Sequence, residues 1–187
     1  MADNPRPPPT IDLDAARLRP LRASDANALF GYLRDPGVTA LTSYPTITQP
    51  MVEAMIDRSL TRWTADEPSK WGVALQDGDQ LVGTCGFNEW SQTHRWAELA
   101  FDLARAHWGQ GLMRQAVAAA LHWAYTNDYV NRVHAFVRVD NARSERLLQR
   151  SGFQREGRLR SYRICHGEPH DFYVYGLLRS EWSESPR

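Results

Sequence analysis

The chain has 187 residues, 42% of them hydrophobic, and its 22 basic and 22 acidic side chains give a formal net charge of zero. This length fits one domain with a substantial core, and the balanced charge excludes global attraction to nucleic acid or to a membrane surface. The sequence contains no apolar run of signal-peptide or membrane-span length, and Cys85 and Cys165 lack metal-ligand spacing. We expect a cytoplasmic protein with two buried thiols and no metal. A homodimer is compatible with this composition.

Four of the first nine residues are proline, and almost no apolar side chains accompany them. This composition predicts an extended, poorly ordered tail, which we place at residues 1–16. A single domain is expected over residues 17–182, followed by a second short disordered tail at residues 183–187.

The apolar periodicity predicts alternating groups of strands and helices after the first tail. They are a strand at 18–21, helices at 25–33 and 48–63, strands at 71–75, 80–87 and 96–103, a helix at 109–127, a strand at 132–139, a helix at 142–151, and strands at 153–157 and 172–178. Ser24 and Thr48 are the expected caps of the first two helices. Such a mixed order implies an α+β or α/β domain with helices in layers on one twisted sheet, not a doubly wound parallel sheet.

Gly109 and Gly111 occupy the turn between the strand at 96–103 and the long helix. A helix start presents unpaired N–H groups and the positive end of the helix dipole, and glycines remove side chains that would keep a diphosphate away. The residues alone leave two interpretations open, a phosphate-binding turn or a merely tight one. The turn lacks the Gly-Lys-Ser/Thr ending of a P-loop and the third glycine of a dinucleotide fingerprint.

The turn does resemble the acyl-CoA loop of the GCN5-related N-acetyltransferases (GNAT), which reads Gln/Arg-x-x-Gly-x-Gly/Ala at the start of the central helix. Here Trp108 stands at the Gln/Arg position and Met113 at the final Gly/Ala position. Trp-Gly-Gln/Lys-Gly is typical of the ribosomal-protein-alanine acetyltransferase branch, the RimJ/RimL type. Further segments look like family segments in the same order, namely 81–87, 97–103, 139–153 and 167–178.

The resemblance implies the family's fold, a mostly antiparallel seven-stranded sheet that splays between its fourth and fifth strands to admit acetyl-CoA. The pantetheine arm would pair with the fourth strand beside Phe101, Asp102 and Leu103. The diphosphate would meet the following turn, where the expected contacts are Trp108, Gly109, Gln110, Gly111, Leu112, Met113 and Arg114.

Asn141 and Ser144 match the family's Asn-x-x-Ser segment. The resemblance implies that Asn141 contacts pantetheine and that Ser144 donates a proton to the departing thiolate, whereas the local sequence alone favours a simple helix cap at Asn141. Attack of the acceptor on the thioester needs a neutral amine. An α-amine with a pKa of about 7.7–8.0 loses its proton more easily than a lysine side chain with a pKa near 10.4, so a weaker base is sufficient for it. Glu98, with Glu89 second, is the expected base, although Glu98 could instead face solvent.

Three functions follow from these residues and the resemblance. The first is acetyl-CoA-dependent acetylation of a protein or peptide N-terminal amine; the others are acetylation of a small amine, such as an antibiotic, polyamine or amino acid, and CoA binding without turnover. The acceptor walls are expected from residues 38–48 and the last hairpin. Four tryptophans could line an acceptor groove or simply fill the core, namely Trp63, Trp71, Trp90 and Trp96.

Overall fold

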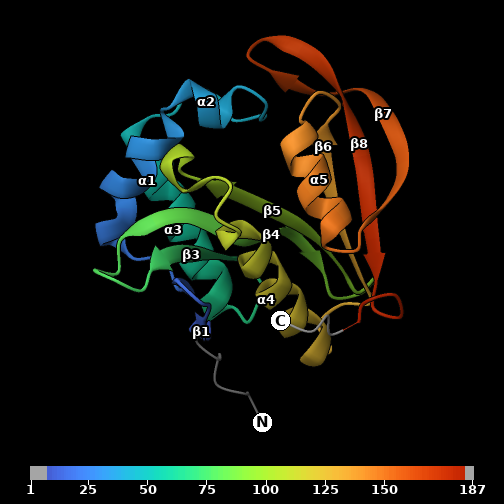
Figure 1. Cartoon of the computed structure of the whole chain (residues 1–187), viewed down its shortest axis with the longest axis horizontal. Coiled ribbons are helices and arrows are strands. Elements are labelled where there is room, and N and C mark those ends of the chain that lie inside the picture. Colours follow the sequence, from blue (N-terminus) through green and yellow to red (C-terminus); the bar gives the residue numbers. More distant parts are fainter. Residues whose placement is uncertain (1–7, 184–187) are drawn as a thin grey trace.

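A twisted sheet of eight strands, ordered β1-β2-β3-β4-β5-β6-β8-β7, runs through the molecule (Figure 1). The computed structural model describes residues 8–183. The strands are β1 (Ile11–Asp12), β2 (Ala16–Arg19), β3 (Lys70–Leu75), β4 (Leu81–Ser91), β5 (Trp96–Leu103), β6 (Arg132–Arg138), β7 (Gln154–Cys165) and β8 (Glu168–Leu178). Neighbouring strands are antiparallel except β5 and β6, which are parallel. The mostly antiparallel sheet expected from the sequence is confirmed.

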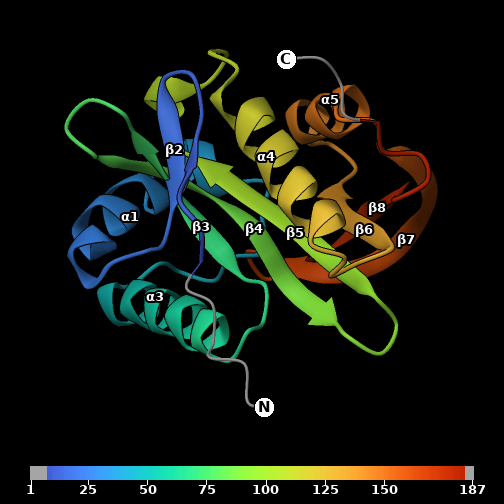
Figure 2. The same ribbon diagram turned by 90° about the horizontal axis from the view of Figure 1, so that it is seen from below.

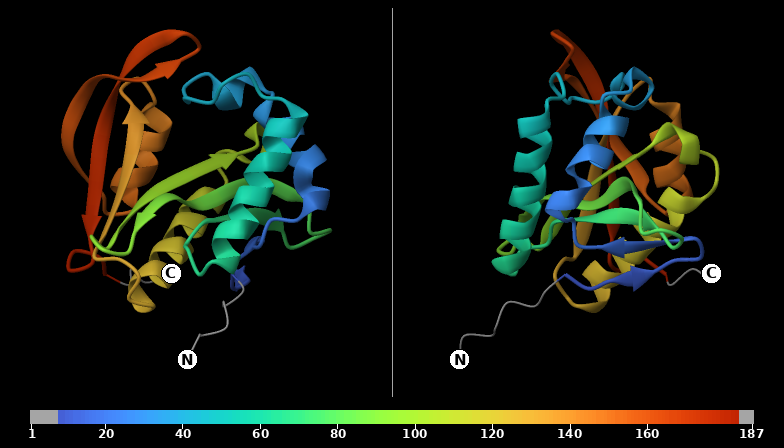
Figure 3. Two further views of the ribbon diagram at one scale, coloured as in Figure 1. Left: turned by 180° about the vertical axis from the view of Figure 1, so that it is seen from behind. Right: turned by 90° about the vertical axis from the view of Figure 1, so that its left-hand side faces the viewer.

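Helices cover both faces of the sheet (Figure 2, Figure 3). On one face lie α1 (Ala26–Leu33) and α3 (Gln49–Thr64), joined through the short α2 (Pro36–Thr39), and on the other lie α4 (Leu112–Thr126) and α5 (Ala142–Arg150). The apolar stripe of α4 is buried, as its 3.6-residue spacing predicts; it comprises Leu112, Ala116, Val117, Ala120, Leu121 and Ala124. The layered arrangement is therefore confirmed. Between residues 8 and 183, no helix has the length and apolarity needed to cross a membrane.

β5 and β6 are paired only over three residues. Their parallel ladder joins Trp96 to Arg132, Ala97 to Val133 and Glu98 to His134. Beyond Glu98 the two strands diverge (Figure 3), while β5 stays paired with β4 as far as Leu103. The side of β5 that faces β6 consequently presents backbone groups without a strand partner after residue 98. This is the splay that the resemblance implies.

The ordered fold begins earlier than residue 17. Ile11 pairs with Leu18 in the short strand β1, and the indole N–H of Trp71 donates to the carbonyl of Pro9 at 3.0 Å. The extra strand makes the sheet eight-stranded rather than seven-stranded. Residues 1–7 and 184–187, which belong to the two predicted tails, lie outside the described residues.

Two predicted helix starts need correction. Gly111 has a φ of +81°, in the left-handed region, so α4 begins at Leu112 and not at residue 109. Ser24 does not cap α1, because a 3₁₀ turn (Ala23–Asp25) precedes that helix and the Asp25 carboxylate accepts from Arg19 and from the backbone N–H of Arg22. The cap at Thr48 is confirmed, since its hydroxyl accepts from the N–H of Met51 at 3.4 Å.

The last hairpin is much longer than predicted. β7 reaches Cys165 and β8 starts at Glu168, with positive φ angles at His166 and Gly167 in the tight turn between them. Residues 154–164 lie at the edge of the sheet and are mostly exposed, so their sequence lacks the apolar alternation by which a half-buried strand is predicted. The expectation for the thiols holds, because Cys85 and Cys165 are both free and buried.

Candidate functional site

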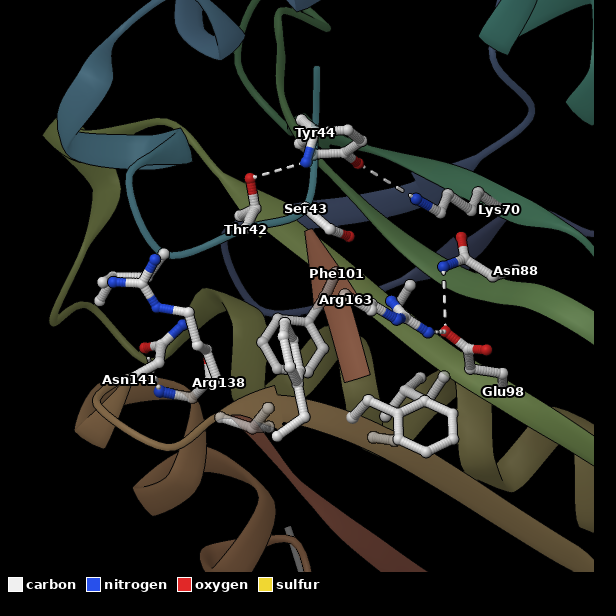
Figure 4. A pocket seen from close by; sticks show the side chains of 18 residues that line it. Thr42, Ser43, Tyr44, Lys70, Asn88, Glu98, Phe101, Arg138, Asn141 and Arg163 are labelled. Atoms are coloured by element: carbon white, nitrogen blue, oxygen red, sulfur yellow. Dashed lines mark hydrogen bonds and ion pairs between the residues drawn. The ribbon is translucent and has the colours of Figure 1, made fainter. Parts of the chain in front are cut away.

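A cleft of about 150 Å³ opens where β5 and β6 diverge (Figure 4). Its walls come from the α2–α3 connection, strands β3 to β6, the start of α5 and the β7–β8 hairpin. The polar residues that line it are Thr42, Ser43, Tyr44, Lys70, Asn88, Glu98, Arg138, Asn141, Ser144 and Arg163. Segments far apart in the chain thus meet at the point where the sheet opens.

Glu98 enters the cleft from the last paired position of β5 and is only 8% exposed. Its Oε1 accepts from Asn88 Nδ2 at 3.3 Å and from Arg163 Nη2 at 3.1 Å. The guanidinium of Arg163 is itself held among aromatic rings, 5.0 Å from the centroid of Phe136 and 5.7 Å from that of Phe172. Glu98 is therefore a buried, oriented carboxylate and not a solvent-facing strand residue.

A β-bulge in β4 decides which of its side chains reaches this site. Phe87 pairs with Leu99 and Glu89 pairs with Glu98, so Asn88 is the extra residue in the ladder. Asn88 lines the cleft, whereas Glu89 is exposed and does not line it. The structure thus brings Glu98 into the cleft and leaves Glu89 outside.

A chain of hydrogen bonds connects Lys70 to the buried side chain of Asp102. The Lys70 ammonium donates to the hydroxyl of Tyr44 at 3.4 Å, and this hydroxyl donates to Asp102 Oδ2 at 3.1 Å. Asp102 also accepts from the hydroxyl of Tyr32, and from Thr84 through its N–H at 3.2 Å and its Oγ1 at 2.8 Å. Four donors satisfy this carboxylate, so it anchors the α2–α3 connection to the sheet.

Burial, and then the nearby Asp102 charge, raise the pKa of both Tyr32 and Tyr44 well above the usual value of a phenol. Both groups therefore stay protonated at neutral pH and act as hydrogen-bond donors. Asp102 and Glu98 lie on the same face of β5, as their period-two spacing predicts, but the Asp102 carboxylate is used inside the fold.

The turn before α4 leaves open space above its backbone. Gly109 and Gly111 have φ angles of +78° and +81°, and a Cβ built at either would meet no atom within 4 Å. Glycine is thus required there by backbone conformation and not by tight packing. The first N–H groups of α4, like those of any helix, lack intrahelical partners. Both Leu112 and Met113 bury their side chains in the core, so Met113 does not crowd the turn.

Trp108 fastens the turn to its neighbours. Its indole N–H donates to the carbonyl of Leu103 at 2.9 Å, and the guanidinium of Arg143 lies 3.4 Å from the centroid of its ring. These contacts tie the turn to β5 and to α5. Gln110 and Arg114 are both exposed in or beside the turn.

Asn141 caps α5, since its Oδ1 accepts from the backbone N–H of Ser144 at 3.2 Å. Both residues also line the cleft. The Ser144 hydroxyl takes no part in this cap and makes no hydrogen bond to any residue from 8 to 183. Arg138 holds the end of β6 beside them, bound to Asp140 at 2.6 and 2.7 Å and to the Ala40 carbonyl at 3.1 Å.

Of the predicted site residues, the cleft brings together Glu98, Phe101, Asn141 and Ser144. Asp102 and Leu103 continue β5 beyond it, and the turn with residues 108–114 follows. The sequence reasoning missed Lys70, Asn88, Arg138 and Arg163. Trp63 and Trp71 belong to the core and Trp90 packs against it; none of the four tryptophans lines the cleft. Within the described part of the chain, no group of three or more His, Cys, Asp and Glu side chains is arranged to hold a metal ion.

Comparison with known proteins places these features in context. Residues 16–154 match the family model described as acetyltransferase (GNAT) domain. The chain is 32% identical over 179 residues to the uncharacterized N-acetyltransferase p20 of Bacillus licheniformis, covering 93% of this chain and 98% of that protein. It is 31% identical over 100 residues to the ribosomal-protein-serine acetyltransferase of Escherichia coli, covering 54% and 56% of the two chains.

Solved structures share the fold. RimL, a ribosomal L7/L12 alpha-N-protein acetyltransferase in complex with coenzyme A, aligns with a TM-score of 0.83 at 20% identity, covering 91% of this chain and 98% of that one. The ribosomal-protein-S5-alanine acetyltransferase from Vibrio fischeri aligns with a TM-score of 0.83 at 17% identity, covering 94% and 100%.

The buried Asp102 cluster makes a prediction for Tyr32→Phe. Because Asp102 loses one donor, the free energy of unfolding at neutral pH should fall by about 1–3 kcal/mol. A phenol whose pKa is raised on folding stabilises the fold fully below its unfolded pKa of about 10, and this contribution is lost as pH rises further. Urea unfolding of wild type and variant should therefore show a stability gap that narrows above about pH 10.

Tyr162→Phe is the matched control. Tyr162 is 42% exposed, and loss of its hydroxyl should change the free energy of unfolding by less than about 0.5 kcal/mol. A gap between wild type and Tyr32→Phe that stays constant to high pH would contradict the raised pKa of Tyr32.

Proposed function

The chain belongs to the GNAT family of N-acetyltransferases, and on that premise we propose that it transfers the acetyl group of acetyl-CoA directly to the N-terminal α-amine of a protein or peptide. The observation that carries this proposal is the opening between β5 and β6, where one cleft contains both Glu98 and Ser144. Relatives named as ribosomal-protein acetyltransferases support the choice of acceptor.

The residues present fit acetyl-CoA, which supplies an acetyl group activated as a thioester when it is bound. Backbone groups of Phe101, Asp102 and Leu103 lie on the part of β5 that β6 leaves unpaired, and they suit the amides of a pantetheine arm. Open space lies beside Gly109 and Gly111 at the start of α4, where helix N–H groups lack intrahelical partners, which suits a diphosphate bound by residues from Gly109 to Arg114. Asn141 has an amide N–H₂ left over from its capping role and lines the cleft between these two regions.

In this proposal Glu98 receives the proton that the amine must lose. Its Oε2 makes no hydrogen bond to the described residues, while Oε1 is held by Asn88 and Arg163. An α-amine with a pKa of about 7.7–8.0 is already roughly a tenth neutral at neutral pH. A weak, well-oriented base, acting directly or through one water, is sufficient.

Ser144 is assigned the opposite proton transfer: its hydroxyl gives a proton to the departing CoA sulfur and regains one from solvent, while Glu98 releases the proton of the amine to solvent. Its hydroxyl lines the cleft and is not engaged by the described residues, so it is available as a donor. The acetyl carbonyl needs a second donor while negative charge develops on its oxygen, and a backbone N–H on the unpaired side of β5 can supply it. Neither role requires a metal ion.

The acceptor is proposed to enter between the α2–α3 connection and the tip of the last hairpin, which face each other at one end of the molecule (Figure 1). His166 at the hairpin tip approaches the carbonyl oxygen of Thr39 to 3.3 Å. Tyr44 is fixed to Asp102 on one side of the cleft, and Arg163 is fixed to Glu98 on the other. Anchored walls of this kind suit the presentation of a chain end in one orientation.

The proposal predicts that purified protein releases CoA thiol from acetyl-CoA when a peptide with a free N-terminus is added. The measurement is thiol release across short peptides, the same peptides with a formylated N-terminus, and a panel of polyamines, aminoglycosides and amino acids. Free peptides should be acetylated and the formylated ones should not. Turnover with small amines alone would reassign the acceptor class, and no turnover with any amine would contradict the reaction.

Gly111→Asp should weaken acetyl-CoA binding through charge repulsion at the diphosphate site. Gly111→Asn is the matched control, because it imposes the same bulk at a φ of +81° without the charge. We expect the dissociation constant, measured by calorimetry, to rise on the order of tenfold more for Asp than for Asn. Equal affinities of the two variants would remove the assignment of this turn to the diphosphate.

Glu98→Gln should lower kcat/KM on the order of a hundredfold, and Ser144→Ala by about tenfold or more, because each removes a proton-transfer group. The Ala variant keeps the α5 cap, which uses the Ser144 backbone. Glu89→Gln, outside the cleft, should stay within about twofold of wild type. A larger loss in Glu89→Gln than in Glu98→Gln would move the base to Glu89.

A further inference from the structure

Lys70 is the only lysine in the chain, whose other 21 basic residues of the Lys and Arg type are all arginine. This one lysine lies in the cleft. Lysine differs from arginine in carrying a compact, strongly hydrated charge on a flexible stem, without a planar fork that demands a bidentate partner. A compact cation is thus found in the cleft of a chain that uses arginine everywhere else.

The backbone holds Lys70 in place independently of its side chain. The Lys70 carbonyl accepts from Ser59 Oγ at 2.8 Å and from the indole N–H of Trp63 at 3.1 Å. Lys70 begins β3, and its Cα pairs with that of Gly86 on β4. The side chain is therefore presented from a rigid position, and substitutions at its end leave these anchors intact.

The ammonium of Lys70 has no carboxylate within ion-pair distance among residues 8–183. Its one hydrogen bond goes to the neutral hydroxyl of Tyr44, and the buried Asp102 lies on the far side of that hydroxyl. An ammonium has three donors, so two remain for a ligand. Figure 4 shows Lys70, Asn88 and Glu98 along one wall of the cleft, on three adjacent strands.

We infer that Lys70 selects acceptors that carry a carboxylate close to the reacting amine and rejects acceptors that carry a second cation there. The inference rests on the proposed reaction and names its acceptor class, a peptide with an acidic residue directly after its N-terminal residue. Glu98 is the carboxylate that meets the amine, and its neighbour Arg163 is already bound to it. Lys70 is then the cation with donors left for a second group, and like charges placed beside it are disfavoured.

The charges that line the cleft also disfavour polyamines and aminoglycosides as acceptors, because these compounds carry more than one ammonium. The cleft is lined by three cationic side chains, Lys70, Arg138 and Arg163, against one lining carboxylate, Glu98. Arg138 donates to Asp140 through Nε and Nη2 and to the Ala40 carbonyl through Nη1, which leaves Lys70 as the cation that an acceptor meets without a competing carboxylate. A second ammonium on the acceptor would lie near this charge with no acidic side chain to receive it.

The test compares kcat/KM for three peptides that differ only at the second residue, Ala-Glu, Ala-Gln and Ala-Lys at the N-terminus. Wild type should prefer Glu over Gln and Gln over Lys, each step on the order of tenfold. Lys70→Met should bring the three peptides to within about threefold, and Lys70→Glu should reverse the order. Arg160→Met is the control, because it removes one exposed cation from β7 outside the cleft and should keep the wild-type order.

A second series separates failure of this inference from failure of the proposed acceptor. The compounds are 4-aminobutyrate, butylamine and 1,4-diaminobutane, which share a carbon chain and differ in the charge at its far end. Turnover restricted to this series, in that order, would move the acceptor class to small amines and keep the role of Lys70. Peptide turnover without a charge preference, or an order that survives in Lys70→Met, would overturn the role of Lys70 and keep peptide acetylation.

Discussion

The site depends on a parallel ladder that stops after three residue pairs. β5 and β6 are joined only as far as Glu98 and His134, yet each is held on its other side by a longer antiparallel partner, β4 and β8 respectively. The two strands can therefore diverge without either becoming loose. Their divergence leaves N–H and C=O groups of β5 and β6 without strand partners. An extended ligand rich in amides can supply those partners.

A second constraint fixes the side of the opening that faces the acceptor. The α2–α3 connection has little regular structure of its own, but Tyr44 is bound to Asp102 in the middle of the sheet. Burying a carboxylate is costly unless its oxygens are satisfied, and here Tyr32, Tyr44 and Thr84 supply four hydrogen bonds. The hydrogen bond from Tyr44 to Asp102 also positions the Tyr44 hydroxyl, which accepts from the Lys70 ammonium. The buried Asp102 carboxylate thus holds both Tyr44 and, through it, Lys70 in the wall of the cleft.

The sequence predicted the centre of the fold better than its periphery. β5 spans the predicted residues, and Glu98 emerges in the cleft, because Ala97, Leu99, Phe101 and Leu103 alternate with polar Glu98 and Asp102 in a strong period-two pattern. The β7–β8 hairpin was predicted too short, so Arg163 was missed; its strand is stabilised by pairing and not by an apolar face. The composition singles out Lys70, since it is the only lysine in the sequence. Its position near Glu98 follows only from the order of the strands in the sheet.

The charges of the cleft also bear on how strong a base the proposed reaction needs. Glu98 shares the cleft with two cations, because Arg163 donates to its Oε1 and Lys70 lines the same cleft. A nearby positive charge disfavours an ammonium relative to a neutral amine, so these cations favour the neutral form of a bound acceptor. Such an acceptor gives up its proton more readily and asks less of the base. This balance favours an α-amine over a lysine side chain, whose pKa near 10.4 leaves far more to overcome.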